Sequence, residues 1–96
     1  MKKARPLLND DDIGRWPVGQ MVRMLVTASG LSIGDAAERL GINRVNLSHI
    51  MGGRKPVSLA MSRRMGEAFN VSPYVLARSQ FEQDYAATMA KDDNAE

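Results

Sequence analysis

The most regular pattern of apolar positions in the chain lies between residues 31 and 54. Within it, apolar side chains recur every three or four residues in two short runs, which predicts two amphipathic helices that each bury one face. The first run is Ile33, Ala36, Ala37 and Leu40, and the second is Leu47, Ile50 and Met51. Gly41 between them is a typical left-handed helix end, so a tight turn joins the two helices into a helix-turn-helix.

Residues at the starts of these two helices and at their crossing fit the same interpretation. Ser32 caps the first helix with Asp35 at its third position, a weaker form of the capping box, and Asn43 caps the second. Ala37 faces the second helix where the two cross, and a larger side chain there would force them apart. A structural helix pair inside some other all-helical domain is the alternative interpretation.

Three further periodic segments predict three more helices. The first covers residues 17–29 and begins with proline, which is favoured at the first helical position. Ser58 caps a helix over residues 59–69, and Asn70 ends it in the left-handed conformation. A last helix covers about residues 73–89. The sequence therefore predicts an all-α fold of five helices, with the helix-turn-helix as the second and third.

The predicted fifth helix carries two stripes instead of one. Val75, Leu76 and Ser79 lie along one face, which is enough to pack the helix on the domain. Another face holds a more aromatic stripe: Tyr74, Phe81, Tyr85 and Met89. If exposed, such a stripe needs a cover, and a symmetric partner is the commonest one. The alternative is that both faces lie in the core of the monomer.

The two ends of the chain lack this periodicity. Residues 1–15 are charged and are expected to form a mobile arm. Four apolar residues in or next to it could anchor it on the domain or on a partner: Leu7, Leu8, Ile13 and Trp16. The acidic run Asp10–Asp12 lacks a glycine turn and further carboxylates at loop spacing, so no metal site is expected there. Residues 16–90 form the predicted domain, and residues 91–96 are expected to be a frayed tail.

Composition narrows the class of protein. The 96 residues, 44% of them hydrophobic, suffice for one domain with a modest core. The lack of cysteine excludes disulfides, thiolate metal sites and thiol catalysis. No apolar run approaches the roughly 18 residues of a membrane span, and the first residues lack the apolar segment of a signal peptide. We expect a soluble, cytoplasmic protein.

Charge is distributed unevenly along the chain, although the net charge is only +2. Residues 31–64 contain six basic and two acidic residues, whereas residues 73–96 contain two basic and five acidic ones. The basic residues gather around the predicted helix-turn-helix, which is the electrostatic footprint of a nucleic-acid binder. A solvated basic face without a partner would show the same distribution.

These motifs resemble the phage Cro and repressor family, often called the XRE family, and within it the HigA-type antitoxins of toxin–antitoxin modules. The resemblance covers about residues 16–84. The matching positions are Pro17, Leu31, Ser32, Ala37, Leu40, Gly41, Ile42, Leu47, Ser48, Gly53, Arg54, Lys55, Ser72, Pro73 and Gln80. The chain departs from the family at three positions. Gly19 stands where the family has an acidic residue, Ile33 where it has a glutamine that contacts the DNA backbone, and Leu76 where it has a tryptophan. The resemblance implies a lambda-repressor-like DNA-binding domain of five helices.

In that fold the second helix of the motif lies in the major groove of double-stranded DNA. The candidates for base contacts on its outer side are Arg44, Val45, Asn46, Ser48 and His49. By chemistry, Arg44 suits the O6 and N7 atoms of guanine, Asn46 suits adenine and Val45 suits the thymine methyl group. The candidates for contacts to the phosphate backbone are Asn43, Arg54 and Lys55. For His49, a solvated surface side chain is an equal alternative.

The resemblance implies a regulator that represses its own operon as a homodimer on an inverted-repeat operator and binds a toxin, such as a RelE-like ribonuclease. The fifth-helix stripe with Phe81 and Tyr85 is the expected dimer interface. A stand-alone prophage or chromosomal repressor and a protein-binding adaptor without DNA binding are the alternatives. No cofactor or enzyme activity is expected. With one histidine, no cysteine and no paired carboxylates on an inward face, the chain offers no pair of nucleophile and base, and Gly52-Gly53 lacks the spacing of a phosphate loop.

Overall fold

A computed structural model describes residues 8–94 of the chain, with side chains described for residues 8–91. Over this range the chain forms a short 3-10 helix and five α-helices, and it has no strand. The elements are η1 (Asp10–Asp12), α1 (Val18–Ser29), α2 (Ile33–Leu40), α3 (Arg44–Met51), α4 (Leu59–Phe69) and α5 (Pro73–Asn94). The predicted all-α fold, with a helix-turn-helix as its second and third α-helices, is confirmed.

Short polar side chains set the starts of three helices. The side-chain oxygens of Ser32, Asn43 and Ser58 each accept a hydrogen bond from the backbone N–H three residues further on, at 3.1, 2.7 and 3.1 Å. These bonds satisfy N–H groups that have no partner within the helix. Gly41 and Asn70 end α2 and α4 in the left-handed conformation, with φ angles of 72° and 55°. The sequence predicts all five of these roles, and each is confirmed.

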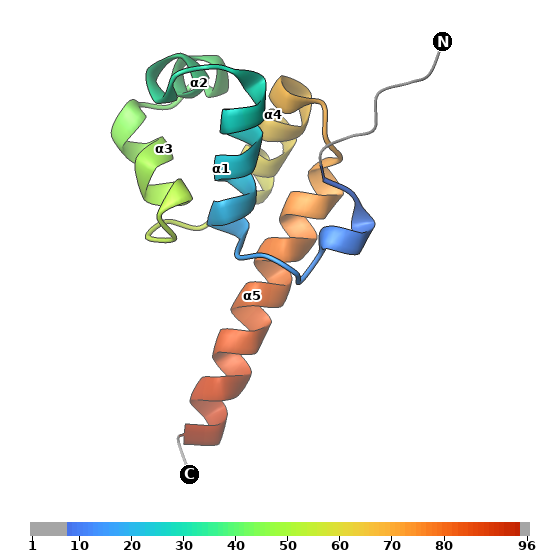
Figure 1. Ribbon diagram of the computed structural model, residues 1–96. Helices are drawn as coiled ribbons and strands as arrows, with labels where there is room; N and C mark the ends of the chain where they lie inside the picture. Colours follow the sequence, from blue (N-terminus) through green and yellow to red (C-terminus); the bar gives the residue numbers. More distant parts are fainter. Residues whose placement is uncertain (1–7, 95–96) are drawn as a thin grey trace.

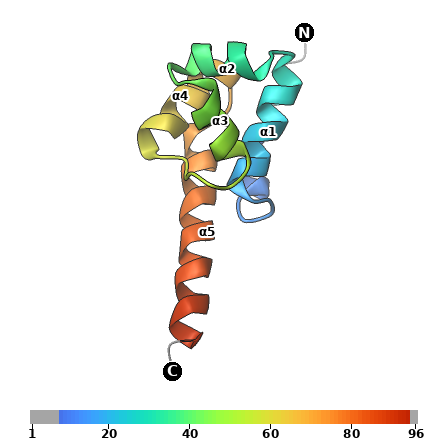
Figure 2. The same ribbon diagram turned by 90° about the vertical axis from the view of Figure 1, so that its left-hand side faces the viewer.

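The hydrophobic core lies among α1, α2, α3, α4 and the first half of α5 (Figure 1). α1 packs against α3, α4 and α5, and α2 packs against α3 and α4. The largest fully buried side chains are Leu8, Met21, Val22, Leu40, Leu47, Met65, Val75 and Leu76. In the turned view, the second half of α5 extends beyond the other four helices (Figure 2). Its side chains after Gln80 are exposed or half-buried as far as residue 91.

The start of α1 touches the end of α3 because residue 19 has no side chain. A Cβ atom on Gly19 would lie 2.5 Å from the carbonyl oxygen of Ile50 and 3.0 Å from that of Met51. A larger residue would therefore displace one of the two helices. Gly19 therefore sets the distance between α1 and α3.

The start of α1 differs from the prediction by one residue. Pro17 is the N-cap of α1 and not its first helical residue, with φ −57° and ψ 139°. Proline has no side-chain oxygen with which to cap the helix. The N–H of Val18 instead donates to Oε1 of Gln83 at 2.9 Å, so α5 supplies the missing cap.

Residues 8–15 differ from the predicted mobile arm. Leu8 is 1% exposed and belongs to the core, so this residue anchors on the domain itself. Asn9 caps η1, and the Asp12 carboxylate accepts from the Asn9 N–H at 3.0 Å. A buried leucine and a local capping box thus order the segment without a long apolar period. Among the described residues, no three His, Asp or Glu side chains gather as metal ligands. Residues 1–7 lie outside the described range.

The C-terminal helix is longer than predicted. α5 runs to Asn94, whereas the sequence predicts an end near Met89 and a frayed tail from residue 91. No glycine or proline occurs between residues 74 and 94, so nothing in the sequence stops the helix. α5 therefore includes residues 91–94, which the sequence assigns to the tail, and residues 95–96 lie outside the described range. None of the helices in the described range combines the length and the apolar character that a membrane crossing needs.

Candidate nucleic-acid interface

α3 buries one face and exposes the other. Its buried residues are Leu47, Ile50 and Met51. Arg44, Val45 and Ser48 are exposed, and Val45 has 61% of its surface accessible even though it is apolar. The structure thus brings these three candidates for base contacts together on the outer face of the first two turns of α3.

Asn46 and His49 are placed less favourably than the other candidates for base contacts. Both are half-buried, so less of each side chain is available to a partner. Asn43 is exposed, but its Oδ1 atom accepts from the N–H of Asn46 at 2.7 Å. The amide group of Asn43 that could meet a phosphate therefore also belongs to the cap of α3.

Backbone hydrogen bonds fix the turn between α2 and α3. The N–H of Gly41 donates to the carbonyl of Glu38 at 3.1 Å, and that of Ile42 donates to the carbonyl of Ala37 at 3.0 Å. Ala37 is 2% exposed, in agreement with its predicted place at the crossing of the two helices. The turn therefore holds α3 in a defined orientation relative to α2 and the core.

The loop after α3 carries the two predicted backbone-contacting cations. Gly53 adopts a φ angle of 79°, which turns the chain back. The N–H groups of Arg54 and Lys55 then donate to the carbonyl of His49 at 2.8 and 3.3 Å. Both side chains are exposed, and neither forms an ion pair within residues 8–91. Two cations beside the end of α3 are thus open to an anion.

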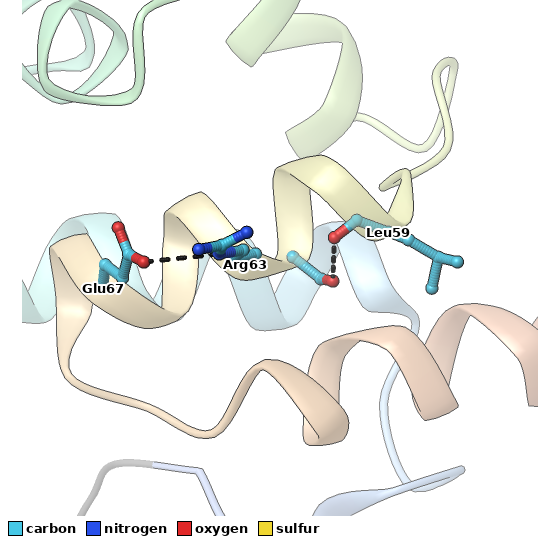
Figure 3. Close-up of polar contacts among 4 residues, drawn as sticks. Leu59, Arg63 and Glu67 are labelled. Carbon is cyan, nitrogen blue, oxygen red and sulfur yellow. Dashed lines mark hydrogen bonds and ion pairs between the residues drawn. The ribbon is translucent and has the colours of Figure 1, made fainter.

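Arg64 contacts the helix-turn-helix from α4, a contact that the sequence pattern does not predict. Its Nη1 atom donates to the carbonyl of Leu40 at 3.4 Å, at the end of α2 where helix carbonyls lack partners. The neighbouring Arg63 instead pairs with Glu67 at 3.6 Å on the exposed surface of α4 (Figure 3). The sequence does not indicate which of the two adjacent arginines contacts α2, because the choice depends on the angle at which α4 crosses α2.

The two stripes of α5 have different surroundings. The inner stripe, Val75, Leu76 and Ser79, is buried in the core. The outer stripe is exposed, at 56% for each ring and 44% for the methionine: Tyr74, Phe81, Tyr85 and Met89. The alternative that both stripes lie in the monomer core is therefore wrong.

Side chains of the outer stripe contact one another along α5. The rings of Phe81 and Tyr85 stack with their centroids 6.1 Å apart, and the Arg78 guanidinium lies 5.4 Å from the centroid of the Phe81 ring. Arg78 also pairs with Glu82 at 2.8 Å, and the hydrogen bond and charge of Glu82 raise the pKa of Arg78. The exposed rings are therefore bordered by a fixed ion pair.

An all-α domain that presents an exposed helix after a tight turn belongs to the helix-turn-helix class of proteins. A family model described as "Helix-turn-helix domain" matches residues 18–78, and the chain belongs to this family. The matched range contains α1, α2, α3, α4 and the start of α5. No curated protein matches the chain.

A solved structure has a similar fold. It is the crystal structure, at 1.60 Å resolution, of a protein from Nostoc punctiforme PCC 73102 that is described as an antidote protein of a plasmid maintenance system. The two chains are 18% identical, with a TM-score of 0.71 over 83% of this chain and 90% of the other. At this identity the likeness shows a common fold.

Proposed function

We propose that this protein is a sequence-specific DNA-binding transcriptional regulator that places α3 in the major groove. The observation that carries the proposal is the exposed face of α3, where Arg44, Val45 and Ser48 lie on a helix whose opposite side is in the core. Membership of the helix-turn-helix family supports it, because the second helix of the motif is the one that reads base edges in proteins of this kind.

The side chains on α3 suit direct base recognition. Arg44, at the first helical position, suits two hydrogen bonds to guanine, and the exposed Val45 suits the methyl group of thymine. Ser48 lies one turn further along and suits either a base or a phosphate. Asn46 and His49 are half-buried and contribute through the exposed parts of their side chains only. Arg44 is therefore the residue from which we expect the largest base-specific effect.

Contacts to the phosphate backbone are assigned to residues at the two ends of α3. Asn43 lies at its start, and Arg54 and Lys55 follow its end. Exposed cations without an intramolecular ion pair release counterions when they meet phosphates, which makes binding salt-dependent. These contacts position α3 on the duplex without reading sequence.

A second copy of the chain is proposed to cover the outer stripe of α5. Three exposed rings and a methionine on one helix are an unusual surface for a monomer, and one short recognition helix reads few bases. A two-fold dimer would place two α3 helices about 34 Å apart, one turn of DNA. The operator would then be an inverted repeat.

The finer assignment is a HigA-like antitoxin that represses its own operon in the cytoplasm and binds a toxin, such as a RelE-like ribonuclease. The XRE-type motif residues support it, as does the fold shared with the antidote protein. A stand-alone prophage or chromosomal repressor is the second candidate. A neighbouring gene for a small ribonuclease would favour the antitoxin. A protein-binding adaptor would keep the outer stripe but show no salt-sensitive DNA binding.

The test is a gel-shift titration with the DNA upstream of the protein's own gene, at about 50 and 200 mM salt. Arg44→Ala should lose about 1–3 kcal/mol of binding free energy, at one base position only. Arg54→Ala should weaken binding to all sequences alike and lower the salt slope by about one. Arg63→Ala is the matched control, because its cation is already paired with Glu67. Identical behaviour of Arg44→Ala and Arg54→Ala would show that α3 is not the base-reading helix.

A further inference from the structure

Two glutamines of α5, three residues apart, tie this helix to distant parts of the chain. The side-chain Oε1 of Gln80 accepts a hydrogen bond from the N–H of Val57 at 2.9 Å, across 23 residues. The Oε1 of Gln83 accepts from the N–H of Val18 at 2.9 Å, across 65 residues. Gln83 thus holds the start of α1, whereas Gln80 holds the loop that joins α3 to α4.

The Gln80 bond closes the far end of the loop that carries the two exposed cations. At the near end, the N–H groups of Arg54 and Lys55 already donate to a carbonyl of α3. Pro56 has no N–H, and the next residue, Val57, is buried with its N–H bound to Gln80. Both cations therefore lie close to two anchors, one on α3 and one on α5.

A second hydrogen bond determines which way the Gln80 amide points. Its Nε2 atom donates to the carboxylate of Asp84 at 2.8 Å, which directs the Oε1 atom to Val57. Gln80 is only 8% exposed and Val57 is buried, so water is a poor substitute for the bond between them. A leucine would fill a similar space but would leave the buried N–H of Val57 without an acceptor.

We propose that Gln80 is a positioning residue for DNA binding: it holds the loop so that Arg54 and Lys55 meet the phosphates while α3 lies in the groove. This proposal rests on the proposed function. Contacts to phosphates set the register of a protein on the duplex. Side chains that must be ordered on binding lower the affinity for DNA. Because α5 also carries the outer stripe, the same bond fixes the loop relative to the proposed dimer helix.

The test compares Gln80→Leu with Gln83→Leu, which loses a bond of the same length to α1 and leaves the bond to the loop intact. Binding of purified protein to the upstream DNA is measured over a range of salt, well below the unfolding temperature. Gln80→Leu should bind about tenfold more weakly, because two cations must be ordered on binding. Its salt slope should fall by about one to two, while the preference for the operator over random DNA is kept. Gln83→Leu should keep the wild-type slope.

A pair of charge variants tests the same bond without removing the acceptor. Gln80→Glu alone places a second carboxylate against Asp84 and should weaken DNA binding. Adding Asp84→Asn places an amide donor beside the new carboxylate at position 80, whose other oxygen still accepts from the N–H of Val57. The double variant should recover most of the DNA affinity and of the salt slope. A role confined to folding would instead change thermal stability and leave the salt slope of the folded protein unchanged. Sedimentation of each variant checks that its association state equals that of the wild type.

Each outcome decides the proposal. It is overturned if Gln80→Leu folds and binds with wild-type affinity and slope, or if Gln83→Leu lowers the slope equally. If Gln80→Leu does not fold, the charge variants decide: a double variant that binds more tightly than Gln80→Glu supports the proposal, and equal binding rejects it. If even the wild type shows no salt-dependent binding and Arg54→Ala changes nothing, the proposed function itself has failed.

Discussion

The helix-turn-helix and the C-terminal helix differ in how much of their structure local sequence determines. α2 and α3 have 8 residues each, and a local cap sets the start of each one. α5 has 22 residues, two stripes, and a second half that leaves the body of the domain (Figure 1). In the short helices, local sequence determines both the boundaries and the buried face. In α5, local sequence determines where the stripes lie but not what covers them.

The two stripes of α5 show why similar residues have different consequences. Leu76 on the inner stripe is 0% exposed, whereas Phe81 on the outer stripe is 56% exposed. Apolar area that is already buried in the monomer stabilises the fold. Exposed apolar area contributes only when a partner covers it. The inner stripe should therefore control folding, and the outer stripe should control association and, through it, DNA binding.

The largest expected effect is on folding. Leu76→Ala should lower the free energy of unfolding by about 2–5 kcal/mol, because it leaves a cavity among buried neighbours. Met89→Ala on the outer stripe is the control and should change the stability of the monomer by less than about 0.5 kcal/mol. Urea unfolding followed by circular dichroism measures both values. Equal losses would mean that the two stripes do not differ in role.

A smaller effect is expected for association. Phe81→Asp should weaken the proposed dimer by about 2–4 kcal/mol, because the carboxylate would lie in an apolar interface. The variant should sediment as a folded monomer with unchanged helical circular dichroism, and its affinity for an inverted-repeat operator should fall steeply. A wild-type protein that is monomeric at micromolar concentration would move the dimer contact elsewhere.

Local signals account for most of what the sequence predicts correctly. The caps Ser32, Asn43 and Ser58 and the left-handed Gly41 and Asn70 act on residues within four positions of themselves. Their effect can therefore be read without knowing the fold. The same holds for the apolar stripes, whose spacing alone separates the buried face of α3 from its exposed face.

The features that the sequence does not predict depend on residues far apart in the chain. The sequence pattern does not indicate that Gln80 and Gln83 bind the N–H groups of Val57 and Val18, because only the packing of α5 brings these residues together. The burial of Leu8 likewise depends on a surface that several helices form together. The roles proposed for the exposed face of α3 and for the outer stripe need a partner molecule, so they remain predictions.

The smallest expected effect separates two adjacent arginines and tests whether the end of α2 is set by local sequence alone. Arg64→Ala removes a hydrogen bond to the carbonyl of Leu40, which is long at 3.4 Å but partly buried, so we expect a loss of about 0.5–1 kcal/mol in unfolding free energy. Arg63→Ala removes an exposed ion pair with Glu67 and should change stability by less than about 0.5 kcal/mol. Urea unfolding at low and high salt measures both variants, and only the small Arg63 effect should vanish at high salt. If Arg64→Ala has no effect, Gly41 alone ends α2. A loss above about 2 kcal/mol would mean that the turn of the helix-turn-helix depends on α4, because a single long hydrogen bond cannot account for it.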